Sequence, residues 1–541
     1  MFALLKENDM KKNMKNKFAV VIFSLLIFGV FLMNTAAQVS QIIVSEPGSL
    51  TKAWNLAALS PQSEIPEKSG FVRGKIQSIT MNSVEAIAAS DELEFIIPSG
   101  KSLIGYRSPG VTSGERKTWE GFLCPSDKTI DKLCAEQHIS VILVFDQNRI
   151  SGVIYDSSGV YEIVSSGKNQ YLVEYIQNYS ENCQVMAEDS AVSEFRSQND
   201  SKSSGFDWDS RTTVTSSQDS GDRVDVMVVY TEAVTSSFGS IAQTELFVET
   251  MMATTNAVLR NSLNRARVNL VRSAQISYAD TGNSSADLSW VKASPIVAQL
   301  RDDSNADLVV MITNSGDACG TSQLLTRSGI NSASGFAVVK RSCAVGGNAF
   351  AHEIGHLFGA DHDPTDSPIP PAMHVLPFAY GKAVNGQFVT LMGFFSNSVC
   401  PAYCPRVLMF SNPAVLYNGT PTGVTSERDN ARVVEFTADA VANIRVSQRT
   451  ITLQSPNTNV TWRRNMIRQI TWDSSNLTGN VRIELSRDGG RSFQVLSEST
   501  PNTGITTISV TGPTTRQARI RVVSIVDPLV TDTSLANFSI I

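Results

Sequence analysis

The residues best suited to chemistry lie in a short stretch of the chain where three of its five histidines occur. His352 and His356 are four residues apart, so on a helix they lie one turn apart on the same face and can bind one metal ion together. Gly359 can end that helix in the left-handed conformation, and the chain then returns His362 towards the same point. Three neutral nitrogen ligands with a fourth position left for water are typical of a catalytic zinc site rather than a closed structural one.

Glu353, directly after the first of these histidines, supplies the base that such a site needs. A zinc ion lowers the pKa of its bound water to about 7. We expect Glu353 to take the proton as this water attacks a carbonyl carbon, and then to deliver it to the leaving nitrogen. The stretch therefore predicts one zinc ion as cofactor and hydrolysis of an amide bond. A helix whose histidines are merely buried in a core is the alternative.

The spacing of the histidines, with Glu353 and Gly359 between them, resembles the signature of the metzincin clan of zinc metalloproteases. Asp363 follows the third histidine directly. In this feature the sequence resembles the reprolysin (adamalysin) branch of that clan. The resemblance implies that the amide is a peptide bond. It also implies that Met392, in the run Val-Thr-Leu-Met-Gly, forms a Met-turn beneath the histidines. We expect Asp363 to support the chain after the third ligand by hydrogen bonding, with a solvated loop carboxylate as the alternative.

A second resemblance concerns the start of the same region. Residues 225–231, with the sequence DVMVVYT, are similar to the opening of the catalytic domain in bacterial peptidyl-Asp metalloendopeptidases. That family would imply cleavage beside acidic residues.

The elements that must position the site lie in residues 222–448, which we expect to form a catalytic domain with the α/β (α+β) metzincin fold. The zinc helix should begin near 346–348 and end at Gly359, after which prolines make 363–378 a loop. A closing helix is expected at about 428–445. Apolar patterns upstream predict strands alternating with helices: a strand at 224–230, a helix at 241–263, a strand at 268–278, a helix at 287–300 and a strand at 306–312.

Residues 335–340 predict one further strand directly before the zinc helix. In metzincins the strand in this position is the edge of the sheet, where an extended substrate can pair by β-augmentation. The resemblance therefore gives residues 335–340 this role, with an ordinary interior strand as the alternative.

The rest of the chain predicts an export signal, a leader domain and a tail. Residues 1–37 combine lysines, an apolar run and small residues, which predicts a cleaved signal peptide, with an uncleaved anchor as the alternative. Residues 38–196 alternate short apolar runs with turns and predict a β-rich domain, which around Trp119 resembles the propeptides of reprolysin-type proteases. Residues 449–541 carry period-two strands without cysteine and predict an immunoglobulin-like β-sandwich.

Residues 197–221 are dominated by small polar side chains, which predicts a flexible linker between the leader and the catalytic domain. Exposed segments of this kind are preferred sites of proteolytic cleavage. We therefore expect a zymogen that a further protease activates. The basic residues at which this cleavage can occur are Arg196, Lys202, Arg211 and Arg223.

Seven cysteines in an exported chain can form disulfides, and the odd number leaves at least one thiol unpaired. Cys319 and Cys343 both fall in the catalytic region and are expected to pair. Cysteines 124 and 134 lie close together in the leader, while 400 and 404 can pair with each other or elsewhere, which leaves Cys183 near the end of the leader. A thiolate of Cys183 could occupy the fourth zinc position and keep the precursor latent, as a cysteine switch. A buried free thiol is the alternative.

The composition of the 541 residues fits a multidomain globular protein, with 42% apolar and 18% charged residues. A net charge of −6 gives no support for binding to nucleic acid or to an anionic membrane, and beyond the export signal no stretch is apolar enough to cross a bilayer. The sequence therefore predicts a secreted, zinc-dependent endopeptidase that acts on protein or peptide substrates, and it assigns no calcium site. The alternative is a non-catalytic, zinc-containing adhesion protein that acts through its β-sandwich tail. Glu353 argues against it, because a structural site needs no base.

Overall fold

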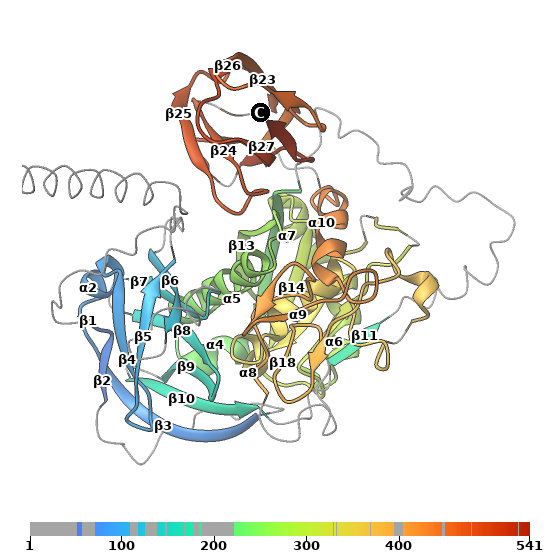
Figure 1. Ribbon diagram of the computed structural model, residues 1–541. Coiled ribbons are helices and arrows are strands. Elements are labelled where there is room, and N and C mark those ends of the chain that lie inside the picture. The colour runs from blue at the N-terminus through green and yellow to red at the C-terminus, as the bar shows by residue number, and fades with distance from the viewer. Residues whose placement is uncertain are drawn as a thin grey trace, which may run out of the picture. The chain divides into compact units, whose positions relative to one another are not determined.

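Figure 1 shows the computed structural model of the chain. The predicted signal peptide, and the predicted linker up to residue 220, lie outside the described residues. Among the helices that are described, none is both long and apolar enough to cross a membrane. The structure describes residues 51–56, 71–108, 117–124, 138–146, 149–166, 169–177, 183–186, 221–327, 329–331, 333–367, 369–393, 404–445, 449–475, 477, 479–528 and 530–541.

Strands β1 to β10 of the leader form one ten-stranded sheet in the order β1-β4-β5-β6-β7-β8-β9-β10-β3-β2, while its last strand, β11, belongs to another sheet. Strands β4 to β10 follow one another as an antiparallel meander. Trp54, Phe95 and Trp119 are buried in its core. The ring centroid of Phe95 lies 5.4 Å from that of Trp54 and 5.9 Å from that of Trp119. Its elements are β1 (Thr51–Lys52), β2 (Trp54–Leu56), β3 (Phe71–Met81), α2 (Val84–Ala89), β4 (Glu92–Ile96), β5 (Ser102–Arg107), β6 (Lys117–Cys124), β7 (Val141–Asp146), β8 (Arg149–Asp156), β9 (Gly159–Ser166) and β10 (Asn169–Gln177).

A mixed six-stranded sheet, in the order β11-β15-β16-β14-β12-β13, carries the predicted catalytic region. Strands β12, β13, β14 and β16 run parallel, and β15 is antiparallel to β16. Strand β12 is buried along almost its whole length, which explains its continuous apolar sequence. The strands are β11 (Cys183–Met186), β12 (Arg223–Thr231), β13 (Arg267–Ile276), β14 (Leu308–Thr313), β15 (Gly320–Gln323) and β16 (Phe336–Lys340).

The helices of this region begin where the sequence offers caps. The side chains of Ser240, Ser294 and Asp429 each accept a backbone N–H from the first turn of the helix that follows. The single helix predicted at 287–300 is in fact two, because Ser294 caps a second helix that opens with Pro295. The helices are α4 (Glu232–Phe238), α5 (Ile241–Asn261), α6 (Ser284–Ala293), α7 (Pro295–Ser304), α8 (Arg341–Ala344), α9 (Ala349–Leu357) and α10 (Asn430–Val441).

The edge of the catalytic sheet is not the strand expected from the sequence. Residues 335–340 contain β16, which lies between β15 and β14 and is therefore interior. At this end of the sheet the outermost strand of the catalytic region itself is β15, with which the leader strand β11 pairs in parallel, and β13 forms the opposite edge. The prediction was wrong because β15 has the sequence Gly-Thr-Ser-Gln, which offers no apolar pattern from which a strand could be predicted.

Among the described residues between α9 and α10 the regular elements are short, and in 363–378, where the prolines predict a loop, the chain makes the 3-10 turn η1. The short elements there are η1 (Pro371–Met373), β17 (Ala383–Val384), β18 (Phe388–Val389), β19 (Leu416–Tyr417) and β20 (Thr420–Pro421).

The tail consists of two sheets that share one hydrophobic core. Trp472 of the three-stranded sheet packs in the same cluster as Ile483 and Ile520 of the six-stranded sheet. Two sheets around one core agree with the predicted sandwich, while its immunoglobulin-like topology stays a prediction. The strands are β21 (Thr450–Ser455), β22 (Thr461–Trp462), β23 (Ile467–Ser475), β24 (Val481–Ser486), β25 (Gln494–Thr500), β26 (Ile505–Ser509), β27 (Thr515–Ser524), β28 (Thr531–Thr533) and β29 (Phe538–Ile540).

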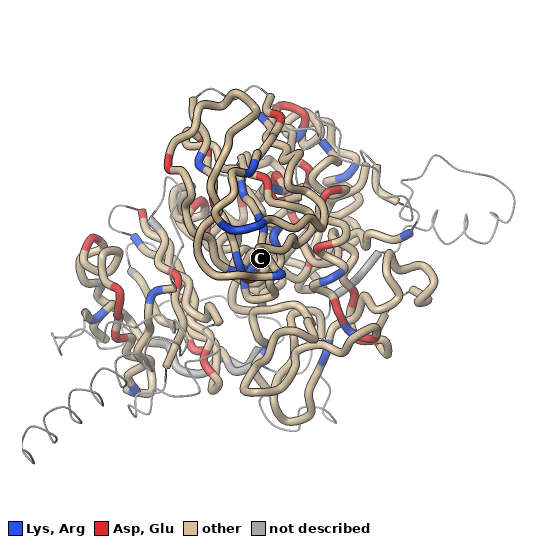
Figure 2. The backbone as a smooth tube through the Cα atoms, turned by 45° about the horizontal axis from the view of Figure 1, so that its top comes forward, with Lys and Arg blue, Asp and Glu red and all other residues tan. Residues whose placement is uncertain are grey.

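Basic and acidic residues are interspersed along the described chain (Figure 2). Several opposite charges pair directly, as Arg265 does with Asp222, Glu435 and Asp439. This distribution agrees with the net charge of −6 and adds no support for a nucleic-acid partner.

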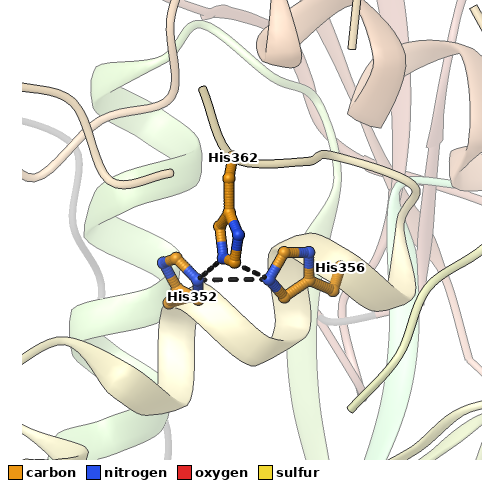
Figure 3. A group of neighbouring side chains, drawn as sticks. All are labelled: His352, His356 and His362. Atoms are coloured by element: carbon orange, nitrogen blue, oxygen red, sulfur yellow. Dashed lines mark hydrogen bonds between the residues drawn. The ribbon is translucent and has the colours of Figure 1, made fainter. Parts of the chain in front are cut away.

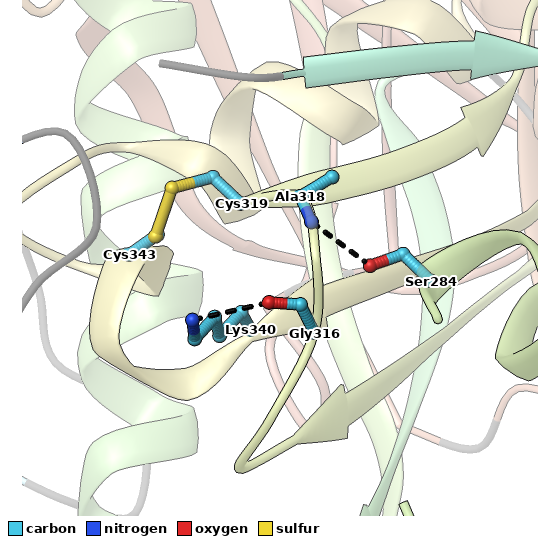
Figure 4. Close-up of a disulfide and its surroundings, with 6 residues drawn as sticks. All are labelled: Ser284, Gly316, Ala318, Cys319, Lys340 and Cys343. Atoms are coloured by element: carbon cyan, nitrogen blue, oxygen red, sulfur yellow. Dashed lines mark hydrogen bonds between the residues drawn. A yellow bond between two sulfur atoms is a disulfide. The ribbon is translucent and has the colours of Figure 1, made fainter. Parts of the chain in front are cut away.

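A disulfide fixes the start of the edge strand β15 (Figure 4). Cys319, directly before β15, is bonded to Cys343 in α8, 24 residues further along the chain, so the predicted pairing is confirmed. Nearby, Ser284 Oγ accepts a hydrogen bond from Ala318 N at 3.4 Å, and Lys340 Nζ donates to the carbonyl of Gly316 at 3.1 Å. The bond therefore ties the edge strand to the segment that leads into α9.

Replacing both Cys319 and Cys343 with serine should destabilise the catalytic region selectively. Closing a loop of this length stabilises the folded state by about 3 kcal/mol, because it restricts the unfolded chain. We expect the free energy of unfolding to fall by about that amount, and the amides of β15 to exchange hydrogen faster. Denaturant titration followed by hydrogen-exchange mass spectrometry measures both. The tail strand β24 is the internal control, and unchanged exchange in β15 would contradict the prediction.

Candidate active site

Helix α9 carries the first two histidines and ends in the turn that the sequence predicts. Gly359 has a φ of +91°, in the left-handed region, and its N–H donates to the carbonyl of His356 at 2.8 Å. The N–H of Ala360 donates to the carbonyl of Gly355 at 2.9 Å. The chain therefore turns back at this point, and His362 faces the two histidines of the helix (Figure 3).

The three Nε2 atoms converge on one point (Figure 3). They lie 3.0 Å apart between His352 and His362, and 3.1 Å apart in each of the pairs that include His356. Three ligands held roughly 2.0–2.1 Å from one zinc ion at tetrahedral angles would lie about 3.3 Å apart. The observed spacing therefore fits one ion.

The other ring nitrogens fix the tautomer of two of these histidines. His352 Nδ1 lies 3.0 Å from the carbonyl oxygen of Leu391, and His356 Nδ1 lies 2.8 Å from that of Ala360. Because a carbonyl oxygen can only accept, both Nδ1 atoms donate. The lone pairs of the Nε2 atoms are then directed at the common point, as metal ligation requires.

Burial keeps all three imidazoles neutral. It lowers the pKa of His352 well below the ordinary value, and the neighbouring His356 and His362 lower it further. Burial and the nearby His362 lower the pKa of His356 to about 3. The pKa of His362 is also lowered by burial, against the opposing charges of Asp361 and Asp366. Since only a neutral imidazole binds a metal, the three side chains are in the form that could bind one at neutral pH.

Glu353 is fully buried and its carboxylate is held from the side of β15. Ser322 Oγ donates to Glu353 Oε2 at 2.5 Å. A Cβ added at Gly320 would lie 2.2 Å from Glu353 Oε1, so the carboxylate occupies the space that a side chain at this position would need. The sequence did not reveal either β15 residue as part of the site. Their only signal was a short polar run before a strand.

Met392 lies directly against the zinc helix at Gly355. Its side chain is fully buried, and a Cβ added at Gly355 would lie 2.8 Å from Met392 Sδ and 2.9 Å from a ring carbon of Phe410. Glycine in the helix therefore makes room for the sulfur. This is the place that a Met-turn would occupy, and the role of Met392 stays a prediction.

Comparison with known proteins agrees with this geometry. Residues 220–403 match the Reprolysin_5 family model, described as metallo-peptidase family M12. This region is a metallopeptidase domain of family M12. Relatives include a peptidyl-Asp metalloendopeptidase of Xanthomonas campestris pv. campestris, 28% identical over 66% of this chain and 84% of its own length. Another, from Stenotrophomonas maltophilia strain R551-3, is 29% identical over 66% of this chain and 84% of its own length. A third, from Stenotrophomonas maltophilia strain K279a, is 32% identical over 41% of this chain and 52% of its own.

The family and these relatives identify the protein as a zinc metalloendopeptidase. Among solved structures, a chain described as "Structure of a chaperone-substrate complex" is 16% identical, with a TM-score of 0.34 over 57% of this chain and 40% of its own. So distant a likeness supports no inference about the fold.

The metallopeptidase domain contains a buried acid–histidine pair that the sequence did not reveal. Asp361 and His374 are both fully buried, and His374 Nε2 lies 2.8 Å from Asp361 Oδ2. Ser367 Oγ donates to the same oxygen at 2.6 Å, and the N–H of His362 donates to Asp361 Oδ1 at 2.7 Å. Burial alone would raise the pKa of Asp361, but these hydrogen bonds and the neighbouring histidines lower it to about 2. An ionised carboxylate therefore anchors the chain directly before the third histidine.

Asp363, to which the sequence gave the supporting role, lies closer to the surface of the domain. It accepts a hydrogen bond from Arg428 Nη1 at 2.5 Å and one from Thr365 Oγ1 at 3.2 Å. Its support for the third histidine stays a prediction beside the stronger case of Asp361. The isolated histidine at position 374, in a proline-rich loop, was the signal that could have led to the buried pair.

Cys183, the predicted cysteine switch, is the first residue of β11. Its backbone pairs with Gly320 of β15, the residue whose side-chain space Glu353 occupies. The leader strand therefore meets the domain at the edge nearest the predicted base.

Replacing Gly320 with alanine should impair catalysis while sparing the metal site. The added Cβ would have to displace the Glu353 carboxylate, and a misplacement of about 1 Å costs on the order of 100-fold in rate. We expect kcat/KM for peptide cleavage to fall by about that factor, with zinc bound per chain unchanged in metal analysis. Gly316→Ala, in the same domain, is the control, because its Cβ would meet the Ser284 hydroxyl oxygen at 2.9 Å, the end of a side chain that can move, and not the Glu353 carboxylate. A Gly320→Ala enzyme of normal activity would show that Glu353 does not depend on this space.

Proposed function

We propose that this metalloendopeptidase is secreted as a zymogen and that Glu353 is its general base. The observation that carries the proposal is a buried carboxylate, adjacent in sequence to a histidine of the site and held by Ser322. A structural metal site has no use for a carboxylate placed in this way. The non-catalytic alternative, adhesion through the tail, leaves Glu353 and its contacts unexplained.

The residues of the chain divide the chemistry between them. His352, His356 and His362 would hold one zinc ion, which supplies positive charge that polarises a carbonyl group and makes water a stronger acid. Ser322 fixes one oxygen of the Glu353 carboxylate, and the absence of a side chain at Gly320 leaves room for the other. Glu353 accepts the proton of the attacking water and passes it to the nitrogen of the departing amine. Met392 packs against α9 at Gly355 and so sets the distance between this helix and the segment that contains Met392.

The relatives support a substrate class. They are named peptidyl-Asp metalloendopeptidases, and the same cleavage beside aspartate is proposed for this chain. The substrates would then be proteins or peptides with an accessible aspartate.

The leader contacts support a latent precursor. Strand β11 pairs with β15, the edge on which an extended substrate would pair by β-augmentation. Tyr155 of β8 donates to the carbonyl of Val345 at 2.8 Å, close to the start of the zinc helix. In this proposal the leader blocks the edge and the Cys183 thiolate masks the zinc. Cleavage in residues 197–221 by a further protease would relieve both, after export directed by residues 1–37.

The proposed function is tested with the secreted protein and its Glu353→Gln variant, which keeps the size of the side chain. A general base typically contributes roughly 100- to 10,000-fold, so we expect cleavage of a peptide library to fall by at least about 100-fold. The wild-type activity should vanish with a zinc chelator and return with zinc. N-terminal sequencing of the secreted form locates the activation site. A Glu353→Gln protein that cleaves like wild type would refute Glu353 as the base.

The latency proposal needs a separate experiment on the uncleaved precursor. We expect the wild-type precursor to be inactive and the Cys183→Ser precursor to cleave peptides without processing, because serine is a poor zinc ligand. Gln184→Ala, in the same strand, is the control and should remain latent. Full latency of the Cys183→Ser precursor would show that the rest of the leader keeps the enzyme inactive, and would rule out a cysteine switch as the cause of latency.

A further inference from the structure

The last residue of α5 holds a stretch of the leader by its main chain. Asn261 Oδ1 accepts a hydrogen bond from the N–H of Ile139 at 2.9 Å, and Asn261 Nδ2 donates to the carbonyl oxygen of the same residue at 2.9 Å. Nδ2 also donates to the carbonyl oxygen of Leu408 at 2.9 Å, which fixes the amide in this orientation. A side chain that pairs with both the N–H and the C=O of one residue recognises an extended main chain, whatever its sequence.

The residue before Asn261 binds a carboxylate of the same leader. Arg260 Nη2 donates to Glu120 Oε2 of β6, and the Glu120 side chain is only 4% exposed. Charged side chains are rarely buried unless they are paired, and this pair follows that rule. Arg260 Nε is also buried, and it donates a hydrogen bond to none of the described residues. The guanidinium therefore has a further donor with which a carboxylate could pair through both of its oxygens.

Positive charge gathers at this end of α5. Arg267, the first residue of β13, lies close enough to Arg260 and to Arg521 of the tail for their charges to act on it. Burial, together with these two charges, lowers the pKa of Arg267 to about 9. Asp222 and Glu120 act in the opposite direction. When the leader departs it takes Glu120 with it, so the positive potential of this surface rises.

Removal of the leader would uncover an apolar surface beside these polar groups. The side chain of Ile139 is buried in the hydrophobic cluster that also includes Val258 of α5. Its departure, with that of its backbone, would leave apolar side chains and the Asn261 amide open to solvent. Polar groups that lose their partners in this way favour a new ligand that offers the same donors and acceptors. An extended segment with an apolar and an acidic side chain has these groups.

We propose that in the processed enzyme the end of α5 is an exosite, a substrate-binding site outside the active site, for an extended acidic segment of a protein substrate. Asn261 binds the main chain of that segment, and Arg260 binds one of its carboxylates. The proposal rests on the function proposed above, because it requires an endopeptidase from which the leader has been removed. Binding at the exosite raises the local concentration of the rest of the substrate at the active site. The competing role is that Arg260 and Asn261 serve the leader alone.

The test uses the processed, zinc-loaded enzyme and two unfolded protein substrates that contain the same cleaved bond. One carries glutamates in segments distant from that bond on both sides, and the other carries glutamines there, so that no aspartate is added. A short peptide that contains only the cleaved bond reports on the active site alone. One hydrogen bond corresponds to about 2- to 10-fold in a binding constant. We expect the wild-type KM to be lower for the glutamate substrate by about that factor, with equal kcat.

Replacement of Arg260 should remove this difference. We expect Arg260→Gln to raise the KM of the glutamate substrate to that of the glutamine substrate, because the lost contact binds the ground state and the transition state equally. Cleavage of the short peptide should stay unchanged. In the wild-type enzyme, added salt should weaken the preference for glutamate, because it screens exposed charges.

Two controls separate this site from charge elsewhere and from folding of the precursor. Arg272→Gln removes a partly exposed arginine of β13 that lies 3.8 Å from Asp303, and should keep the preference for glutamate. Glu120→Gln changes only the leader, so its processed enzyme should behave like wild type. Arg260→Gln leaves Glu120 buried without its partner and can prevent the precursor from folding. The double variant Glu120→Gln/Arg260→Gln removes both charges and yields the same processed enzyme.

The outcomes are distinct. A wild-type enzyme that cleaves the short peptide but shows no preference for the glutamate substrate overturns the exosite and leaves the proposed function intact. A preference that persists in the Arg260→Gln enzyme does the same. Native mass spectrometry that finds the leader still bound to the active enzyme overturns it as well, because the two residues then serve the leader alone. A wild-type protein that cleaves no peptide at all refutes the proposed function, and the inference falls with it.

Discussion

Three imidazole nitrogens lie 3.0–3.1 Å from one another in the core of the metallopeptidase domain. The surrounding residues keep these nitrogens directed at one point. Such nitrogens can bind one metal ion together only when each is unprotonated and its lone pair is directed inward. Burial removes the protons, and carbonyl oxygens of Leu391 and Ala360 orient two of the rings from behind. The left-handed turn at Gly359 and the ionised Asp361 bring the third imidazole to the same point. A structure of this kind is unfavourable without a cation, which is why its presence argues for one.

The helix and strand around the three histidines contain glycines where a neighbouring side chain needs space. The zinc helix needs glycine at position 355 because Met392 occupies the space beside it, and the edge strand needs glycine at 320 because Glu353 does. The disulfide between Cys319 and Cys343 holds the end of that strand to the segment before the helix. Steric constraints between distant segments, rather than local preference, thus decide which residues these positions tolerate.

The sequence was informative where function imposes a short spacing. The offsets of the three histidines predicted the helix, its ending and the convergence of the three imidazoles, because those relations lie within eleven residues of one another. The apolar run of β12 and the cap of α10 were equally local. It failed where a polar residue acts on a distant one. Strand β15 has no apolar pattern, so its place at the edge came to light only through its pairing with β16.

Two further residues were hidden for the same reason. His374 and Arg406 lie far along the chain from the groups that they contact, and neither belongs to a recognisable spacing. A single buried imidazole or guanidinium in a sequence is compatible with many environments. Only the folding of the irregular segment between α9 and α10 brings them to Asp361 and Leu391. Polar side chains in such segments carry information that no periodicity reveals.

The glycine at position 320 has a consequence for fidelity. If a substrate pairs with β15 as proposed, its alignment can shift only in steps of one residue, roughly 3.3 Å each, and each step would turn its side chains to the opposite face. Only one alignment brings a given bond to the carboxylate of Glu353, which lies against that glycine. An error of one step would present a different bond and reverse every neighbouring side chain at once. In the proposed function, the choice of bond would therefore depend on discrete alignment of the main chain as well as on the side chains that flank the bond.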